Sequence, residues 1–470
     1  MRQGLLPYTV EAVPEADTLT ARAGLPLVLE MMHALGLDTV IGEAVQVRQR
    51  ESGYTETAKV EALVLLLAAG GTCLDDIEVL KVDRGLARLL ERTLPGADTL
   101  RQCLYAFHDE RLIDAAQAAR PAGTVAYIPG ENAALQGLAR VNTALVHRVA
   151  AQGRGTRATL DYDATIQESH KREAQGHYQG GRGYQPAACY WVEQDLVVAD
   201  EYRDGNVPAG MATLPLIQRG FQSLPPTVTG YFFRADSASY DERVLQWLAD
   251  PARPGGPRGP IGFTISADMT DPLRRLCAAV PEETWELLEA RATETVRCAE
   301  VEFTPGDWSK VAWPLRYLVL QLRKTQGELF ATGSDTKYLA VVTNRTGGAA
   351  ALIRWHWQKA GTIELVHDVT KNELGAAVPP CGRFGANAAW YRLSLFTYNV
   401  LSAMKSLALP AHLNTARPKR LRFALFTLAG RLITHAGQLV VRISAEAERL
   451  VGLIAARTRL AALALRIAAG

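Results

Sequence analysis

Two aspartates, separated by one residue, stand in a stretch of the sequence that could do chemistry. Asp161 and Asp163 belong to "TLDYDAT", whose β-branched and aromatic residues predict a strand. Residues i and i+2 of a strand point to the same face, so both carboxylates should project together. Like charges side by side are unfavourable unless a cation lies between them. The pair therefore fits either a metal site or a solvated edge strand.

Two more carboxylates follow far downstream. Asp236 ends the predicted strand "GYFFRAD", and Glu364 lies in a predicted long helix over residues 350–374. An acid at the end of a buried strand faces the edge of the sheet where α/β proteins bind ligands. Carboxylates from separate elements suit hard divalent cations, and two Mg²⁺ ions about 4 Å apart can drive phosphodiester cleavage.

One face of the predicted helix combines unusual residue types. At about 100° per residue, Trp357, Ala360, Glu364 and Lys371 fall within about 60° of one another. A carboxylate, a lysine and a tryptophan on one face suit a surface that holds metal, phosphate and base, so Trp357 and Lys371 are candidate DNA contacts. His367 and Asp368 border this face and are expected to be solvated neighbours.

The elements that must position these side chains change character along the chain. Helical apolar spacing over residues 20–115 gives way, from residue 156, to short β-rich runs that alternate with helices. This alternation predicts a mixed α/β core. The second and third acids lie 128 residues apart, far more than a strand and a helix need, which predicts an insertion between them. The predicted units are an N-terminal helical region for DNA binding or dimerisation (1–150), the first part of the core (151–269), a β-rich insertion (270–335), the second part of the core with the Glu364 helix (336–410) and a basic C-terminal helical region (411–470).

Charge is distributed unevenly along the chain. The net charge is only +2, but residues 411–470 hold ten Lys and Arg against two Glu, so they carry +8 and the rest carries −6. This asymmetry predicts docking on phosphate, although a solvated helix shows the same bias. If the region is one helix, Arg431, Arg442 and Arg449 share a face with His435 and are candidate DNA contacts.

Composition excludes several classes of protein. The six cysteines are scattered without a CxxC pair, which argues against structural zinc and a disulfide framework and fits a reducing cytoplasm. The N-terminus lacks the basic-then-apolar order of a signal peptide, and the longest uncharged apolar run, residues 62–74, is too short to cross a bilayer. A soluble cytoplasmic protein with no membrane partner is expected. The glycine-rich "GGRGYQ" lacks both the GxGxxG spacing and the GK[ST] end of nucleotide-binding loops.

The order of these motifs resembles a known family. "DYDAT", "RADSASYDERVL", "VVTN" and "WHWQKAGTIELVHDVTKNEL" are similar to segments of the DDE transposases of bacterial insertion sequences, in the group with a Tyr-x2-Arg-x3-Glu-x6-Lys signature. The likeness to insertion-sequence family thirteen-eighty extends from about residue 20 to 455 and includes "GYQP", "RDGN", "RFGAN" and "TLAGRLITHAG".

This resemblance implies a ribonuclease-H-like catalytic core in which Asp163, Asp236 and Glu364 bind two Mg²⁺ ions, with Mn²⁺ as a substitute. Asp161 is the reserve candidate for the first ligand. Lys371 matches the signature, Trp357 replaces its tyrosine, and Ala360 stands where an arginine is expected. The loss of that arginine removes a bidentate phosphate contact, so either activity is weakened or Arg354 or Lys359 supplies the charge.

The resemblance also implies the partners. A cut-and-paste transposase binds the terminal inverted repeats of its element, cleaves donor DNA and joins the 3′ ends to target DNA, as a homodimer in a synaptic complex near the bacterial nucleoid. Lys171, Arg172 and Arg182, in the hairpin that follows the first acid, are then candidate phosphate contacts.

A hairpin DNA intermediate would require an aromatic ring to hold a flipped base. Trp308 and Trp313 are the available aromatics, and packing within the sheet is an equally good explanation of both. For the stacking role, Trp308 follows the turn "TPGD" and is expected to be exposed, whereas Trp313 is expected in the core. Two other functions remain open: a captured transposase that only binds DNA, favoured by Ala360, and a nuclease of the same fold, disfavoured by the insertion and the large helical flanks.

Overall fold

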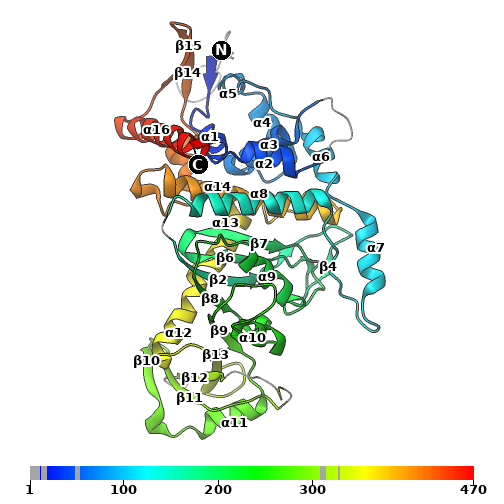
Figure 1. Cartoon of the computed structure of the whole chain (residues 1–470), viewed down its shortest axis with the longest axis vertical. Coiled ribbons are helices and arrows are strands. Elements are labelled where there is room, and N and C mark those ends of the chain that lie inside the picture. Colours follow the sequence, from blue (N-terminus) through cyan, green and yellow to red (C-terminus); the bar gives the residue numbers. More distant parts are fainter. Residues whose placement is uncertain are drawn as a thin grey trace, which may run out of the picture.

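The computed structural model describes residues 11, 18–47, 53–153, 155–306, 308, 314–325 and 329–469. It is elongated, with helices at one end, a large sheet through the middle and a β-rich lobe at the other end (Figure 1). None of the helices in these ranges is long and apolar enough to cross a membrane.

A nine-stranded mixed sheet is the central element of the molecule. In spatial order its strands are β10 (Glu286–Ala290), β11 (Glu294–Val301), β12 (Arg316–Lys324), β13 (Thr336–Thr343), β9 (Ile261–Ala267), β8 (Gly230–Ala235), β2 (Arg157–Ala164), β6 (Ala187–Trp191) and β7 (Leu196–Glu201). Strands β2, β8 and β9 run parallel, and the remaining pairs are antiparallel. The predicted mixed α/β class is therefore confirmed.

The two faces of the sheet differ in chemistry. Alternate residues of the parallel strands, such as Leu160 and Phe233, face α9 (Thr213–Gln222), whose Phe221 ring lies 6.4 Å from that of Phe233. The intervening residues are mostly polar and face α12 (Ala349–Trp357) and α13 (Ile363–Glu373); Thr264, for example, bonds His356 of α12 at 3.0 Å, and Phe232 packs against Trp355 of α12. The acids of interest lie on this polar face because the side chains of a strand alternate.

The segment predicted as an insertion extends this same sheet. Strands β10, β11 and β12 continue it beyond β13, and α11 (Asp271–Ala279) lies in the same lobe (Figure 1). A small apolar cluster fills the space between these strands and α12, with Leu318, Leu320 and Ile353 among its fully buried members.

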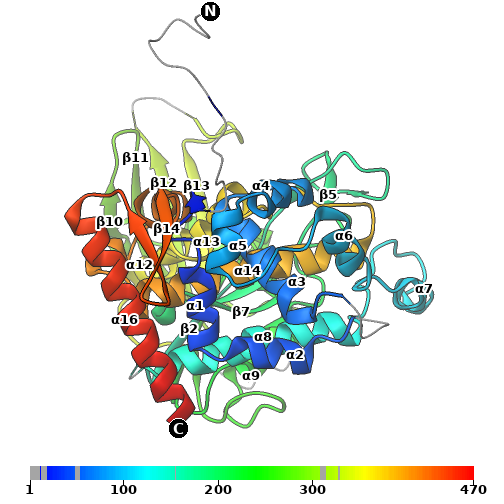
Figure 2. The same ribbon diagram turned by 90° about the horizontal axis from the view of Figure 1, so that it is seen from above.

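Short helices make up the N-terminal region. They are α1 (Leu27–Ala34), α2 (Leu37–Ala44), α3 (Glu56–Ala69), α4 (Ile77–Lys81), α5 (Arg84–Leu89), α6 (Ala97–Tyr105), α7 (Glu110–Ala119) and α8 (Ala133–Ala150). Helix α3 begins at Thr55, whose side chain accepts a hydrogen bond from Ala58 N, and ends at Gly70, whose φ of 96° suits glycine. Helix α14 (Phe384–Leu407) runs beneath these helices, and both views show this arrangement (Figure 2).

The C-terminal region departs from the prediction of continuous helix. Residues 430–443 form a hairpin of β14 (Gly430–His435) and β15 (Gln438–Ile443), with the short β1 (Leu19–Thr20) on its other edge, before α16 (Ala447–Ala469). Ala436 and Gly437 both have positive φ, of 48° and 75°, which is the geometry of a tight two-residue hairpin turn. The helical assignment was wrong here because "RLITH" and "QLVVRI" have strand character on either side of that turn.

A buried ion-pair network joins the helical region to the sheet. The Arg392 guanidinium of α14 lies 2.9 Å from Asp200 in β7 and 2.7 Å from Glu131, which precedes α8. It also donates to the Leu135 carbonyl oxygen at 2.7 Å. The arginine thus satisfies two carboxylates that would otherwise be buried without a countercharge.

We expect Arg392→Met to lower the free energy of unfolding by about 3–5 kcal/mol, because it leaves Asp200 and Glu131 uncompensated. Urea denaturation followed by circular dichroism measures the change. Arg291→Met is the control, since Arg291 pairs with Glu289 and Glu294 at the surface and its loss should cost about 1 kcal/mol or less. Equal effects of the two substitutions would contradict the role of the network.

Candidate active site

The three candidate acids come from three adjacent elements. Asp163 lies near the end of β2, Asp236 directly follows β8, and Glu364 is in the first turn of α13. Since β2 and β8 are parallel neighbours with Tyr162 opposite Ala235, their carboxyl ends bring the two aspartates to the same edge. Asp236 also caps the turn that follows it by accepting a hydrogen bond from Ala238 N at 3.1 Å.

A lysine lies among these carboxylates. Lys359 Nζ is 3.3 Å from Asp163 Oδ1 and 3.8 Å from Glu364 Oε1. The pKa of Asp163 is raised to about 6, chiefly by burial; Lys359 lowers it, and the negative charges of Asp236 and Glu364 add to the rise. The structure therefore brings all three predicted acids into one electrostatic site.

His367 lies against the other oxygen of Asp163. Its Nε2 is 3.9 Å from Asp163 Oδ2, and neither ring nitrogen has a hydrogen-bond partner among the described residues. The expectation that His367 is solvated was wrong, because α13 turns it toward the sheet. Burial lowers the pKa of His367 to about 3, so the ring is neutral. Asp368, in contrast, is at the surface, where it pairs with Arg417 at 2.7 Å.

The predicted long helix 350–374 is broken. Helix α12 passes into a short 3₁₀ segment (Gln358–Gly361), and Thr362, with φ −119° and ψ −93°, separates it from α13. The face expected to join Trp357 and Ala360 to Glu364 therefore does not exist. Trp357 instead packs on the apolar cluster of the β-rich lobe, with the Arg291 guanidinium 5.8 Å from its ring.

Asp161 makes a different kind of contact from Asp163. Its two oxygens accept hydrogen bonds from Arg234 Nε and Nη2 at 2.7 and 2.8 Å, and it also accepts one from the Thr362 hydroxyl. The pair is buried and bidentate, so the charge of Asp161 is already matched. This geometry favours Asp163 over Asp161 as a metal ligand.

The predicted DNA contacts near the acids make internal hydrogen bonds. Lys371 Nζ donates to Thr165 Oγ1 at 3.0 Å and to the Ile166 carbonyl at 2.9 Å, which anchors the loop after β2. Arg182 donates to the carbonyls of Ala174 and Arg172 within a small sheet of β3 (Gln167–Glu168), β5 (Arg182–Tyr184) and β4 (Gln175–Gly176). Lys171 and Arg172 lie in the turn between β3 and β4, and the Arg172 side chain is 93% exposed.

The expected exposure of Trp308 was wrong. The residue is only 8% exposed, and its ring centroid lies 4.8 Å from that of Tyr240, four residues after Asp236. The ring is therefore directed inward, toward the loop that carries the second acid. Trp313 lies outside the described residues.

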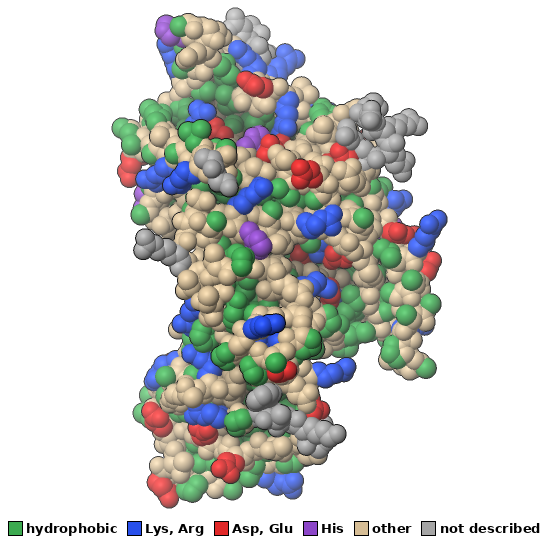
Figure 3. Space-filling view, viewed as in Figure 1, with side chains coloured by type: hydrophobic (Ala, Val, Ile, Leu, Met, Phe, Trp, Pro, Cys, Tyr) green, Lys and Arg blue, Asp and Glu red, His purple; other side chains and the backbone are tan. Residues whose placement is uncertain are grey.

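The C-terminal arginines do not share a helix face. Arg431 and Arg442 are instead directly opposite each other on β14 and β15, both exposed, whereas Arg449 lies in α16 beside Glu446 at 3.8 Å. On the face shown in Figure 3, Lys and Arg side chains are interspersed with acidic and apolar ones and form no single basic patch.

The acid cluster has the donor chemistry of a magnesium site but is not closed around an ion. Carboxylate oxygens are the ligands that Mg²⁺ and Mn²⁺ prefer. In the described part of the chain, however, no three His, Cys, Asp or Glu side chains are close enough together to hold a metal. The residues fit a divalent cation if Asp163, Asp236 and Glu364 draw together, and the ammonium of Lys359 now occupies part of the space between them.

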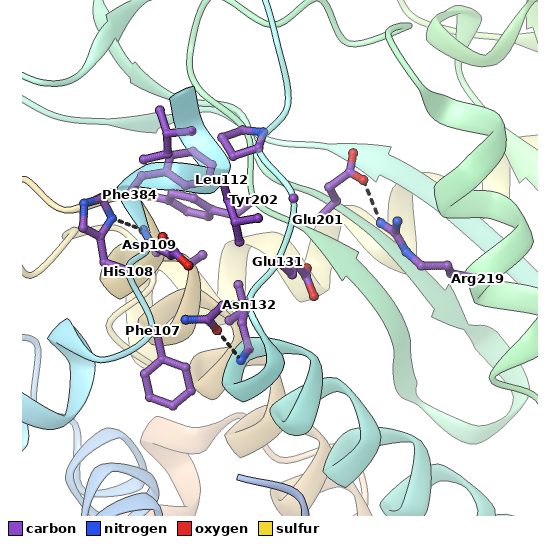
Figure 4. Close-up of a pocket in the computed structure, with 16 residues that line it drawn as sticks. Phe107, His108, Asp109, Leu112, Glu131, Asn132, Glu201, Tyr202, Arg219 and Phe384 are labelled. Carbon is purple, nitrogen blue, oxygen red and sulfur yellow. Dashed lines mark hydrogen bonds and ion pairs between the residues drawn. The ribbon is translucent and has the colours of Figure 1, made fainter. Parts of the chain in front are cut away.

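A separate cavity of about 110 Å³ lies between the segment after α6, the start of α8 and the start of α14 (Figure 4). Its polar side chains are already paired: Arg219 with Glu201 at 2.7 Å, and Asn132 with Leu135 N at 2.9 Å. None of the three acids lines it. The cavity therefore offers no group that a bound ligand would have to satisfy.

Arg234 and Thr362 were not identified from the sequence as parts of the site. Arg234 stands two residues before Asp236, Thr362 two residues before Glu364, and their common partner Asp161 two residues before Asp163. Each of the three acids thus lies two residues after a member of one hydrogen-bonded cluster, which consists of Asp161, Arg234 and Thr362. The two-residue spacing can be read in the sequence, but the hydrogen bonds that join the three cluster residues cannot.

Comparison with known proteins identifies the relatives of this chain. Residues 7–464 match the family described as "Transposase DDE domain group 1". No curated protein matches the sequence. Among solved structures, the fold is similar to that in "Cryo-EM structure of piggyBac transposase synaptic complex with hairpin DNA (SNHP)", with a TM-score of 0.44, 10% identity, and coverage of 86% of this chain and 81% of that one.

We expect Asp163→Asn to stabilise the metal-free protein at pH 8 by up to about 3 kcal/mol. The folded-state pKa of about 6 lies above the unfolded value of 3.8, so the ionised carboxylate destabilises the fold fully above pH 6 and not below pH 3.8. Thermal denaturation in a chelator at pH 8 and pH 4 measures this, and the gain should vanish at pH 4.

Asp161→Asn is the matched control for that substitution. Burial also raises the pKa of Asp161, but the loss of this carboxylate should destabilise the protein at pH 8, because it breaks a bidentate pair and leaves the buried Arg234 guanidinium without its countercharge. If Asp161→Asn stabilised the fold and Asp163→Asn did not, the roles assigned to the two aspartates would be reversed.

Proposed function

The chain belongs to the transposase DDE domain group 1 family, and on this premise we propose that it is a cut-and-paste DNA transposase with Asp163, Asp236 and Glu364 as its catalytic acids. The observation that carries the assignment of these residues is that Asp163 and Glu364 both pair with the ammonium of Lys359, while the charge of Asp236 acts on Asp163. Three carboxylates with so little countercharge form a site that favours a divalent cation.

The core around these acids has the strand order expected of a ribonuclease-H-like fold. Taken in chain order, β2, β6 and β7 form an antiparallel meander, and β8 and β9 then add in parallel on the other side of β2. Helices α9 and α10 (Glu242–Ala249) connect these strands on one face. This arrangement supports a catalytic core in two parts, 151–269 and 336–410, separated by the insertion 270–335.

We assign the metal-dependent chemistry to this core. Two Mg²⁺ ions, when bound, would activate the attacking oxygen and stabilise the leaving oxygen of a phosphodiester. Asp163 and Asp236 would hold them from the strand ends and Glu364 from α13, while His367 limits solvent at the far side of Asp163. Lys371 positions the loop after β2, and through it the end of the strand that carries Asp163.

The DNA partners follow from the same proposal. The terminal inverted repeats of a bacterial insertion sequence, of the family and signature group that the motifs resemble, would bind to the N-terminal helical region (1–150) and to basic residues at the surface. These are the half-buried Lys171 and the exposed Arg172 beside the core, and the exposed Arg431, Arg442 and Arg449 in the C-terminal region (411–470). Two copies would be needed to bring two ends together. A stacking role for Trp308 remains a prediction, and the ring would have to separate from Tyr240 to meet a base.

A captured transposase that only binds DNA is the competing function. Its main support is Ala360, at the position of a signature arginine. The neighbouring Lys359 weakens that argument. Its ammonium pairs with Asp163 and Glu364 and so supplies a positive charge at the site, which Ala360 cannot do. Arg354, the other alternative, donates to the Leu288 carbonyl in the β-rich lobe.

Asp163→Asn, Asp236→Asn and Glu364→Gln should each abolish Mg²⁺-dependent cleavage while leaving DNA binding within a few-fold, since each residue serves metal and makes no base contact. The substrate is the DNA that flanks the coding sequence, end-labelled and resolved on a denaturing gel. Cleavage at wild-type rate by any of the three would remove that residue from the site. If wild-type protein binds these ends and never cleaves them, the captured, DNA-binding protein is the correct reading.

A salt titration tests the C-terminal hairpin as a DNA contact. Replacing Arg431 and Arg442 together with alanine should reduce the slope of log K against log salt by about two units at most, and weaken binding to all sequences alike. Arg291→Ala, in the β-rich lobe, is the control. An unchanged slope would show that these cross-strand neighbours do not contact the phosphates of DNA.

A further inference from the structure

The ammonium of Lys359 is enclosed by negative charge. The lysine is buried, and both of its ion pairs in the described chain are to carboxylates, Asp163 at 3.3 Å and Glu364 at 3.8 Å. Asp236 and Asp161 also lie within electrostatic reach of this group of charges. Arg234 neutralises Asp161, so Lys359 is the cation that pairs directly with Asp163 and Glu364, and Lys371 adds a second positive charge within electrostatic reach of Asp163.

The contacts of Lys359 are looser than those of the structural ion pairs nearby. Arg234 meets Asp161 in a bidentate geometry at 2.7 and 2.8 Å, and Arg392 approaches Glu131 at 2.7 Å. Lysine is a compact point charge on a flexible stem, and it makes no fixed fork with a carboxylate. At 3.3 and 3.8 Å it balances charge without locking either acid in place.

The backbone at Lys359 is suited to movement of this side chain. The residue lies in the short 3₁₀ segment between α12 and α13, and not within either helix. Thr362 holds the end of that segment by donating to Asp161, so α13 and Glu364 stay in position when the lysine moves. The side chain can therefore leave without displacing the third acid.

We propose that Lys359 is the resident counter-cation of the active site: its ammonium holds the place of a metal ion among Asp163, Asp236 and Glu364 and is displaced when a divalent cation binds. The inference rests on the proposed metal-dependent function. It gives Lys359 a positioning role that no signature position predicts, because it keeps the acids folded toward one another in the metal-free protein. It also makes metal affinity weaker than the three carboxylates alone would give.

Manganese binding to the full-length, metal-free protein without DNA tests the proposal. Free Mn²⁺ is measured by its electron paramagnetic resonance signal for wild type, Lys359→Met and Lys359→Arg. We expect Lys359→Met to bind Mn²⁺ at least about tenfold more tightly, because the ion no longer competes with a buried charge. Lys359→Arg keeps the charge and should stay close to wild type.

Lys405→Met is the matched control. Lys405 is also a largely buried lysine that pairs with a carboxylate, Asp195 at 3.0 Å, but it belongs to α14 and is not among the three acids. Both methionine variants should lower the denaturation temperature in a chelator, because each removes the lysine that pairs with a carboxylate. When Mn²⁺ is added, the denaturation temperature of Lys359→Met alone should rise, by more than the substitution had lowered it. If Lys359→Met does not fold without metal, Lys359→Gln provides the same comparison.

The outcomes separate this inference from the function on which it rests. Equal or weaker Mn²⁺ binding by Lys359→Met, while Asp163→Asn abolishes binding by the wild type, would overturn the counter-cation role and leave the metal site intact. Tighter Mn²⁺ binding by Lys405→Met as well as by Lys359→Met would also overturn the counter-cation role, because loss of any buried lysine would then have the same effect. Absence of Mn²⁺ binding in every variant would overturn both the inference and the proposed metal-dependent function.

Discussion

The buried ion pair between Asp161 and Arg234 is the interaction on which the site depends. It joins β2 to β8, and the hydroxyl of Thr362 adds α13 to the same carboxylate. Arg234 also donates to the Trp355 carbonyl at 2.7 Å, which fixes the end of α12. Because each acid stands two residues beyond a member of this set, one hydrogen-bonded cluster sets the positions of all three. Burying a bidentate ion pair carries a free-energy penalty of desolvation, but the pair fixes the relative positions of the elements that it joins. Metal ligands require such fixed positions.

The two aspartates of β2 therefore have different surroundings despite their shared face. Asp161 is matched by the bidentate guanidinium of Arg234. Asp163 is opposed by the longer ion pair with Lys359 and lies beside the neutral His367, so its charge is less fully matched. The difference comes from the partners that the neighbouring elements bring, and it separates a fully paired carboxylate from a weakly paired one within three residues.

The sequence indicated three candidate acids that the structure brings near one another, and their catalytic role stays a prediction. Asp163 and Asp236 were proposed because strand alternation and strand ends are local features that a pattern records, and Glu364 because of the residue types on its predicted helix. Their surroundings were predicted poorly. The break at residues 358–362 was missed because "WHWQKAGTIEL" contains no proline and only one glycine, and the interruption depends on the Thr362 hydrogen bond to Asp161, 201 residues away. The hairpin of β14 and β15 was missed for the opposite reason: its strand pattern and Ala-Gly turn were present, but the helical context on both sides outweighed them. The inward direction of Trp308 depends on Tyr240, a partner that no local pattern names.

Continuity of the sheet has a consequence for how this protein can change over evolution. Strands β10 to β12 are hydrogen-bonded in series onto β13, so the segment between the second and third acids is not a detachable module. Its removal would leave β13 as a bare edge, with backbone amides and carbonyls open to pairing with other chains. Such an edge promotes aggregation, so lineages of this fold are expected to vary the segment in loops and side chains and to retain its strands.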